Sequence, residues 1–332
     1  MLTKENFAQR YPGLAPATYA ALRLWLDQLD ARSYGSTQYW NDLSGLGNHF
    51  EQATVDNQPS IAGPSRVFDG TNDYLAQSPV YSNASIACTI VLTAGSASLL
   101  VTGVSLTPYD GKFVRVYDGA KYAWGYISTG AGPIVSTVGG ATQNWTDQEV
   151  GFNTGAATFK VEIFPPGLNI LGALTILAWV KTGSSNTQGV VNKWFESSNS
   201  LLRRRSWSLT VKGGSGVLRF LISDTFNGAF LVDGSAVVTT DTWVQVGARF
   251  VPSTSIQNYV NGVADGSPNT TSIPAALYNT RQEVWVGAGI TDGSPYVPFV
   301  GSIAQVMIFA GALSAAEIRR IYLRDLPRYQ VA

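Results

Sequence analysis

The segment that most restricts the fold lies late in the chain, from Phe299 to Tyr322. Apolar residues recur at near-alternating positions through Ile303–Phe309, which predicts a strand with one buried face. Ser314 stands three residues before Glu317, the spacing of a capping box, in which each side chain satisfies a backbone N–H of the first helical turn. We therefore expect a strand, a tight turn and a short helix over Ser314–Leu323.

The composition is that of an all-β protein. Charged residues make up 13% of the chain and aromatic residues 11%, while 34 Gly and 15 Pro separate many short runs rich in Val, Thr, Ile, Tyr and Trp. Lys plus Arg equal Asp plus Glu at 22 each. The charge balance therefore gives no basis for binding nucleic acid or an anionic membrane surface.

Cysteine usage and hydropathy restrict the compartment. Cys88 is the single cysteine, so no intrachain disulfide can form. The first residues lack the continuous apolar core of a secretory signal, and no run of about 18 apolar residues predicts a membrane span. We expect a soluble chain without a signal peptide and without membrane insertion, assembled in the cytoplasm of the cell that makes it.

Two parts of the chain carry a series of short motifs in a fixed order. The first part contains WLD, WNDLSGLGNH, NQP and FDGTNDYL, and the second contains LTILAWVK, DTWVQVGARF, NYVNG and VWVGAG. In this order the motifs resemble the laminin-G-like jelly-roll domains of bacteria and bacteriophages, in the concanavalin A-like lectin/glucanase superfamily. The resemblance implies an all-β fold, a concanavalin A-like jelly-roll β-sandwich.

Several turns and pairings follow from these motifs. FDGTNDYL is expected to form a hairpin around Asp69-Gly70. Asn261-Gly262 predicts a two-residue hairpin turn by itself, because both residues tolerate positive φ. In the jelly roll, Ile303–Phe309 is expected to pair with strands near Leu24 or Val67.

Residues 80–169 separate the two parts of the motif series. Their short alternating runs, divided by Gly and Pro, predict a second, smaller β-sandwich domain inserted in a loop of the jelly roll. The phrase DGKFVRVYDGAKYAWGYIS is similar to modules of bacteriophage tail and fibre proteins. The alternative is a long decorated loop or extra hairpins within one sandwich. The expected organisation is an N-terminal arm at 1–21, which either docks on a partner or packs as a lid, a discontinuous jelly roll at 22–79 plus 170–326, the inserted domain at 80–169 and a C-terminal tail at 327–332.

The sequence contains no recognisable catalytic constellation. A laminarinase-type hydrolase of this superfamily aligns carboxylates as E-x-D-x-x-E, and none of the seven glutamates has that spacing. His49 is the single histidine and lies in the Gly-rich turn SGLGNH, where a loop residue satisfied by local hydrogen bonds is the simpler interpretation. Gly45 and Gly47 are not followed by the G-K-[ST] of a phosphate loop. We therefore expect no enzymatic activity.

Two turns carry residues that could hold calcium. Asp69, Asn72 and Asp73 lie on one turn, and Asp42 and Asn48 lie on another. Some laminin-G-like domains bind calcium on the sandwich rim, so the resemblance implies that an ion could bind here through carboxylate and amide oxygens. The alternative is that Asp and Asn occupy these turns because their side chains bond to the local backbone. No other cofactor is expected.

A glycan site requires an aromatic ring flanked by polar side chains. Trp179 and Trp285 lie in apolar runs, so we expect them in the core. The candidates for a glycan-binding surface are tryptophans near turns and the neighbouring run of arginines: Trp124, Trp145, Trp194, Trp207, Arg203, Arg204 and Arg205. The arginines could contact an anionic glycan or a neighbouring subunit, or they could form a charged loop tip.

The expected function is that of a non-enzymatic bacteriophage virion protein, a tail, neck or head fibre or decoration component. Its lectin-like domain would attach to host-surface glycans, and its other partners would be further virion proteins. A homotrimer is common among phage fibres, although this chain has no heptad stem. The alternative is a stand-alone carbohydrate-binding module or a diverged glycoside hydrolase.

Overall fold

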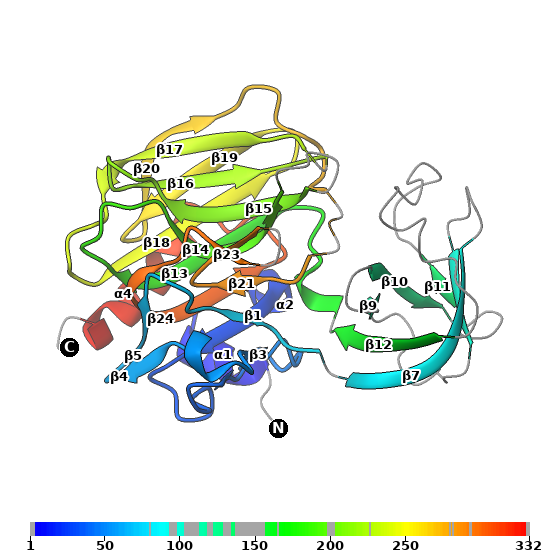
Figure 1. Cartoon of the computed structure of the whole chain (residues 1–332). Helices are drawn as coiled ribbons and strands as arrows, with labels where there is room; N and C mark the ends of the chain where they lie inside the picture. Colours follow the sequence, from blue (N-terminus) through cyan, green and yellow to red (C-terminus); the bar gives the residue numbers. More distant parts are fainter. Residues whose placement is uncertain are drawn as a thin grey trace. The chain divides into compact units, whose positions relative to one another are not determined.

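The computed structural model describes residues 4–79, 81–92, 98–102, 113–117, 122–128, 134–136, 157–164, 166–197, 203–225, 227–278, 280, 282–291 and 294–329 (Figure 1). The chain divides into two compact units. The larger unit, called the jelly roll below, comprises Met1–Gln77 and Gly167–Ala332. The smaller unit, called the inserted unit, comprises Ser78–Pro166.

Sheet A of the jelly roll has the strand order β20-β19-β18-β13-β24-β5-β4 among the described residues. One edge of β24 pairs with β13, and its other edge is divided between β5 and β1. All pairs of this sheet are antiparallel. Its strands are β1 (Leu22–Asp27), β4 (Ser60–Ala62), β5 (Ser65–Asp69), β13 (Leu174–Lys181), β18 (Val244–Val251), β19 (Ser255–Val260), β20 (Val263–Asn269) and β24 (Val300–Phe309).

Sheet B faces sheet A and has the order β17-β16-β15-β14-β21-β6-β3-β2 in the described part of the chain. The β22–β23 hairpin joins it through a parallel pairing of β22 with β14. Its strands are β2 (Tyr39–Trp40), β3 (Phe50–Glu51), β6 (Leu75–Gln77), β14 (Gln188–Glu196), β15 (Arg204–Val211), β16 (Val217–Ile222), β17 (Phe230–Val237), β21 (Trp285–Val286), β22 (Gly289–Thr291) and β23 (Ser294–Tyr296).

The main core lies between the two sheets and follows strand alternation. In β16, Leu218, Phe220 and Ile222 are fully buried, while the residues between them are partly exposed. These side chains belong to one cluster with residues of β13 and β24. Each fully buried Leu, Ile or Phe contributes about 1.5–3 kcal/mol relative to an exposed one, so this layer is the main source of stability.

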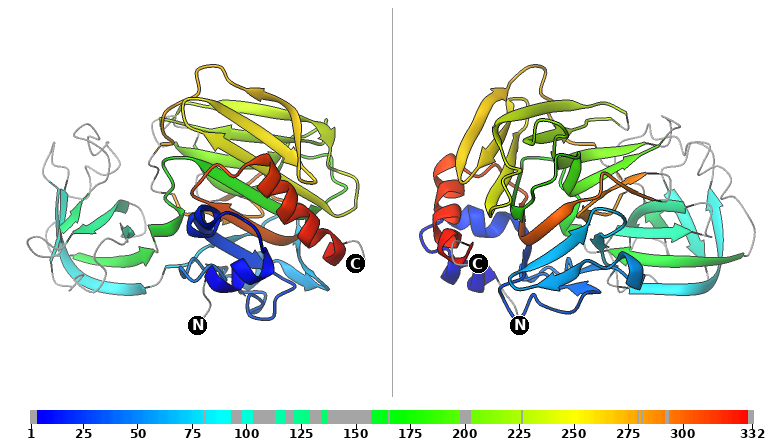
Figure 2. Two further views of the ribbon diagram at one scale, coloured as in Figure 1. Left: turned by 180° about the vertical axis from the view of Figure 1, so that it is seen from behind. Right: turned by 60° about the vertical axis from the view of Figure 1, so that its left-hand side comes forward.

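Three helices cover the outer face of sheet A: α1 (Lys4–Arg10), α2 (Pro16–Ala21) and α4 (Ala315–Tyr329) (Figure 2). Phe7 and Tyr11 are buried against Trp25 of β1, with Phe7 and Trp25 ring centres 5.2 Å apart. The residues expected to form an N-terminal arm therefore pack on the sheet. Short 3-10 turns occur at η1 (Val55–Asn57) and η3 (Pro166–Leu168). None of the described helices has the length and apolar character needed to cross a membrane.

The last helix is longer than the sequence predicts. It was expected to end at Leu323, with a tail from residue 327, but α4 continues to Tyr329 and contains Pro327. The physical reason is tertiary packing. The Tyr329 ring lies 4.4 Å from the Trp179 ring, and Arg328 forms two hydrogen bonds of 2.9 Å with the Asp27 carboxylate. These contacts offset the unfavourable effect of the proline.

The expected hairpin around Asp69-Gly70 is wrong. Its two strands, β5 and β6, lie in different sheets: β5 pairs with β4 and β24, and β6 pairs with β3 and β21. The turn is tight, with Gly70 at φ 80°. It therefore carries the chain from one sheet of the sandwich to the other.

Three other local predictions are confirmed. Leu24 pairs with Ile308, and Val67 pairs with Ser302 of the same strand β24. Asn261 and Gly262 both adopt positive φ, 51° and 72°, between the paired residues of a hairpin. The capping box is present in full: the Ser314 backbone N–H donates to Glu317 Oε2 at 2.9 Å, and the Glu317 N–H donates to Ser314 Oγ at 3.3 Å.

The described strands of the inserted unit form a closed barrel, not the expected small β-sandwich. Around the barrel the order is β10-β11-β8-β7-β12-β9, and β9 pairs with β10 to close the ring. Closure leaves these strands without a free sheet edge, a recurrent solution for small all-β units. The strands are β7 (Tyr81–Leu92), β8 (Ser98–Thr102), β9 (Phe113–Tyr117), β10 (Tyr122–Ser128), β11 (Ile134–Ser136) and β12 (Ala157–Phe164).

Candidate functional site

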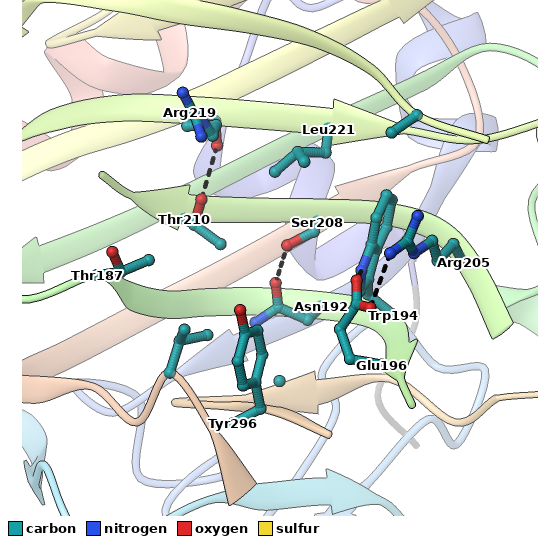
Figure 3. A pocket seen from close by; sticks show the side chains of 13 residues that line it. Thr187, Asn192, Trp194, Glu196, Arg205, Ser208, Thr210, Arg219, Leu221 and Tyr296 are labelled. Atoms are coloured by element: carbon teal, nitrogen blue, oxygen red, sulfur yellow. Dashed lines mark hydrogen bonds and ion pairs between the residues drawn. The ribbon is translucent and has the colours of Figure 1, made fainter. Parts of the chain in front are cut away.

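A pocket of about 200 Å³ opens on the outer face of sheet B, over β14, β15 and β16 (Figure 3). The β22–β23 hairpin contributes Tyr296 to one wall. The lining residues combine aromatic, amide, hydroxyl and charged groups: Thr187, Asn192, Trp194, Glu196, Arg205, Ser208, Thr210, Arg219, Leu221, Ala229, Gly289, Tyr296 and Val297.

Strand alternation brings polar side chains to the pocket. On β15, Ser208 and Thr210 line it, whereas Trp207, Leu209 and Val211 belong to the core between the sheets. The sequence RSWSLTV thus has a polar face and an apolar face. The polar face forms the floor of the pocket.

A β-bulge adds Arg205 to this face. The register between β14 and β15 shifts at Ser206, so that Trp194 pairs with Arg205 across the bulge. An extra residue in one strand reverses the side-chain alternation beyond it. Arg205 and Ser208, three residues apart, therefore line the same pocket.

Glu196 joins Trp194 and Arg205 on the right-hand side of the pocket in Figure 3. Its Oε1 accepts a hydrogen bond of 2.6 Å from the Trp194 indole, and its Oε2 accepts one of 2.7 Å from Arg205 Nη2. The Arg205 guanidinium lies 5.2 Å from the centre of the Trp194 ring, within the range of a cation–π contact. Arg203 Nε adds an ion pair at 3.4 Å to Glu196 Oε2. Both carboxylate oxygens are therefore engaged.

A second cluster of charges borders the opposite end of the pocket. Asp233 accepts hydrogen bonds of 2.7 and 2.9 Å from Arg219 Nε and Nη2, and one of 2.9 Å from Lys212 Nζ. The hydrogen bonds from Arg219, followed by the one from Lys212, lower the pKa of the Asp233 carboxyl to about 2. Asp233 therefore remains ionised at neutral pH.

The floor and the hairpin wall offer neutral groups. Asn192 Nδ2 donates to the Ala288 carbonyl at 2.9 Å, and Ser208 Oγ donates to Asn192 Oδ1. Tyr296 is 45% exposed, so its ring is accessible. Val297 follows with φ 46°, a conformation that costs a non-glycine residue about 1–3 kcal/mol.

The structure separates the predicted glycan residues. Trp194 and Arg205 line the pocket, and Arg203 joins them through Glu196. Arg204 is buried, with Nη1 donating to the Arg203 carbonyl, and the arginine run leads into β15 instead of forming a loop tip.

Trp207 is the other predicted glycan tryptophan whose side chain the structure describes, and it does not line this pocket. Trp207 is fully buried between the sheets because it shares the apolar face of β15, so the prediction that it is a surface residue is wrong. Trp124 lies in β10, where only the backbone is described, and Trp145 lies outside the described residues. Trp179 and Trp285 are buried, as predicted.

Asp42 and Asn48, two of the calcium candidates, have a structural role. The Asp42 carboxylate accepts hydrogen bonds from the backbone N–H groups of Trp25, Ser44 and Asn48. Burial raises the pKa of the Asp42 carboxyl, and its effect is larger than that of these hydrogen bonds, which lower the pKa. Asn48 Nδ2 donates to the Arg23 carbonyl at 2.7 Å. These oxygens and amides fix a buried turn.

The second set of candidates stabilises the crossing turn between the sheets. Asp69 Oδ1 accepts from the Thr71 N–H at 2.7 Å, and Asp73 Oδ2 accepts from the Asp69 N–H at 2.9 Å. Asn72 Nδ2 donates to Asn57 Oδ1. Within the described ranges, no group of three or more His, Cys, Asp or Glu residues is arranged to hold a metal.

Sequence reasoning missed Asn192, Arg219 and Tyr296. The alternation of VLRFLI could have placed Arg219 on the polar face of its strand, because Leu218 and Phe220 occupy the apolar face. Tyr296 gave no such signal, since its position depends on the parallel pairing of a distant hairpin with β14. Strand alternation alone would therefore have placed Arg219 on the polar face that lines the pocket, but it would not have placed Tyr296 in the pocket wall.

Residues 153–319, half of the chain, match the profile of the Concanavalin A-like lectin/glucanases superfamily. The two facing sheets and the pocket on the outer face of one of them define a lectin-like β-sandwich protein. The chain belongs to the Concanavalin A-like lectin/glucanases superfamily.

Solved structures are similar to the chain at low sequence identity. Trypanosoma rangeli sialidase in complex with 2,3-difluorosialic acid is similar with a TM-score of 0.52 and 14% identity, over 96% of this chain and 37% of that one. The CBM40 of Ruminococcus gnavus IT-sialidase bound to alpha2,3 sialyllactose has a TM-score of 0.38 and 18% identity, over 48% of this chain and 88% of that one. No curated protein sequence matches the chain.

Proposed function

We propose that this protein is a non-catalytic glycan-binding protein whose site is the pocket on the outer face of sheet B. The observation that carries the proposal is the combination of an exposed Tyr296 ring with convergent amide, hydroxyl and guanidinium groups. Sugars are held by an aromatic ring against their C–H face and by directional hydrogen bonds to their hydroxyls. At about 200 Å³ the pocket is smaller than the roughly 300–1,000 Å³ of drug-sized ligand sites, which suits one ring of a longer glycan.

The carboxylates at the pocket favour binding over hydrolysis. Glycoside hydrolysis by a pair of carboxyl groups requires one of them to carry a proton. The low pKa of Asp233 opposes that role. Both oxygens of Glu196 already accept hydrogen bonds from Trp194 and Arg205.

Binding to a glycan array tests the site. Tyr296→Ala is expected to weaken binding of any glycan that the wild type retains by about fivefold, because stacking on an aromatic ring contributes about 1 kcal/mol. Tyr39→Ala is the matched control, since Tyr39 is 41% exposed and lies on the same sheet in β2. The proposal fails if the wild type binds no glycan, or if both variants bind as tightly as the wild type.

The biological setting that we propose is a bacteriophage virion, in which the protein is a tail, neck or head fibre or decoration component, displayed for attachment to host-surface glycans. The motif resemblance to phage laminin-G-like domains and tail modules supports this role. The protein would assemble in the host cytoplasm with other virion proteins, as a homotrimer.

Mass spectrometry of purified virions and light scattering of the purified protein test the virion role. We expect the chain among the virion proteins and a mass three times that of the 35.5 kDa chain. Its absence from virions, with glycan binding intact, would instead identify a stand-alone carbohydrate-binding module.

A further inference from the structure

The two charge clusters at the pocket have the same composition. Each consists of one carboxylate shared by two cations: Glu196 with Arg203 and Arg205, and Asp233 with Arg219 and Lys212. Each cluster therefore carries one excess positive charge. The chain as a whole has a formal net charge of +0, so positive charge is concentrated at this pocket.

Part of this positive charge is available to a ligand. Asp233 engages Nε and Nη2 of Arg219, while Arg219 Nη1 has no hydrogen-bond partner among the described residues. The Arg219 side chain is 29% exposed and lines the pocket, and the Lys212 side chain is 38% exposed. By contrast, Glu196 is 21% exposed and has both oxygens occupied.

The neutral hydrogen-bonding groups and the charged group of the pocket lie at different positions. Asn192 and Ser208 lie near the middle of the pocket, Tyr296 lies on its hairpin wall and Arg219 lies at one end, as Figure 3 shows. A sugar ring at the centre would therefore present a substituent toward the guanidinium. Guanidinium groups bind carboxylate and sulfate oxygens through charge-assisted hydrogen bonds, which are about twice as strong as neutral ones.

We propose that the pocket is selective for acidic glycans, with a carboxylate or sulfate group of the bound sugar placed at Arg219 and Lys212. This inference rests on the proposed glycan-binding function and specifies its ligand class. Carboxylated and sulfated sugars share the anionic group that the site recognises. The source of that group is decided by the arms of the experiment.

The test is calorimetric titration of the full chain with four oligosaccharides: an oligogalacturonate, its methyl ester, a sulfated galactan and the corresponding neutral galactan. We expect at least one acidic member to bind about tenfold more tightly than its neutral counterpart in about 50 mM salt, and the difference to shrink in about 500 mM salt. Which acidic member gains distinguishes a carboxylate from a sulfate ligand.

Variants then assign the selectivity to the pocket. Arg219→Gln is expected to remove most of the preference for the acidic member over its neutral counterpart. Arg32→Gln is the matched control, because Arg32 bonds Asp30 through the same pair of nitrogens, Nε and Nη2, at a site outside the pocket lining. If Arg219→Gln does not fold, Lys212→Gln replaces it, with the same expected direction.

The outcomes separate this inference from the proposed function. Equal binding of acidic and neutral sugars, both weakened by Tyr296→Ala, would overturn the acidic selectivity and leave the glycan site standing. A preference that survives both Arg219→Gln and Lys212→Gln would also overturn it. If no oligosaccharide binds and the array is silent, both proposals fail together.

Discussion

The outer faces of the two sheets carry the same kinds of ion pair in opposite surroundings. On sheet A, under the helices, Asp27 and Asp325 are fully buried and share Arg10 and Arg328. On sheet B, Asp233 is 29% exposed beside the open pocket. In both clusters an Asp carboxylate pairs with Arg. The helices that cover sheet A make its cluster structural, whereas the open face of sheet B leaves its cluster available to a ligand.

The buried cluster joins three elements that are distant in the sequence. Arg10 is the last residue of α1 and Tyr11 follows it, Asp27 comes from β1, and Asp325 and Arg328 come from α4. The Tyr11 hydroxyl lies 2.9 and 3.0 Å from the two oxygens of Asp325, and burial raises the pKa of that tyrosine well above its usual value. Every buried charge has at least one opposite charge or hydrogen-bond donor beside it, which is the condition for a buried ion cluster to persist.

The largest effect is expected from Asp27→Ala. This change leaves Arg10 and Arg328 without one carboxylate under the helices, and breaking a buried pair in this way costs about 3–5 kcal/mol. Chemical denaturation measures the loss in the free energy of unfolding.

Asp233→Ala is the matched change on the open face. Because solvent reaches Arg219 and Lys212, its cost is expected to stay below about 1 kcal/mol. Equal losses from the two variants would contradict the distinction between the covered and the open face.

A smaller effect, dependent on pH, is expected from Asp325→Asn. Burial raises the pKa of Asp325 from its ordinary value of 3.8 to about 6. Between these values the folded protein binds more protons than the unfolded chain, so this group's contribution to stability is complete below about pH 4 and is lost as the pH rises through about 6. The slope is at most about 1.4 kcal/mol per pH unit.

Denaturation curves at several pH values measure the slope of stability in the wild type and in the variant. The difference between them isolates Asp325 from other carboxyls. A wild-type slope that is retained by Asp325→Asn would show that this group does not titrate in that window.

The last change, also with a small expected effect, is Ser314→Ala at the start of α4. Loss of the cap leaves the Glu317 backbone N–H in the first turn of the helix without its side-chain partner and costs about 1 kcal/mol. Thermal denaturation measures the change, with Ser60→Ala on the exposed strand β4 as a control. Glycan binding should be unchanged in both variants, and a loss of binding in Ser314→Ala would show that the covered face influences the open one.

The fold was largely predictable because many of its elements depend on residues that are close together in the sequence. The strand at Ile303–Phe309, the Asn261-Gly262 turn and the Ser314/Glu317 pair depend on neighbours in the sequence, and each is confirmed. The expectation that this strand has only one buried face is wrong, because the helices on the outer face of sheet A bury its other side as well. The crossing at Asp69-Gly70 was not predictable in the same way, since a tight turn fits a hairpin and a change of sheet equally well. Only the pairing partners of β5 and β6 decide between them.

The site was harder to predict from the sequence, because it too depends on pairings between distant strands. Trp194 and Arg205 were named from their residue types, but the bulge at Ser206 that turns Arg205 toward the pocket has no sequence signature. Tyr296 enters through a hairpin whose pairing spans a long stretch of chain. Trp207 was misplaced because its polar neighbours were weighed without the alternation that sends it inward.

The position of β24 has a consequence for biosynthesis. β1 and β5 emerge early from the ribosome, yet the edge that β24 completes stays open until Ile308 and Ser302 have been made. Pairings between such distant segments form slowly, because the entropy of closing a long loop is lost before the contacts form. During that interval the nascent sheet has an unprotected gap at its centre, so chaperone demand should be highest just before the last strand is released.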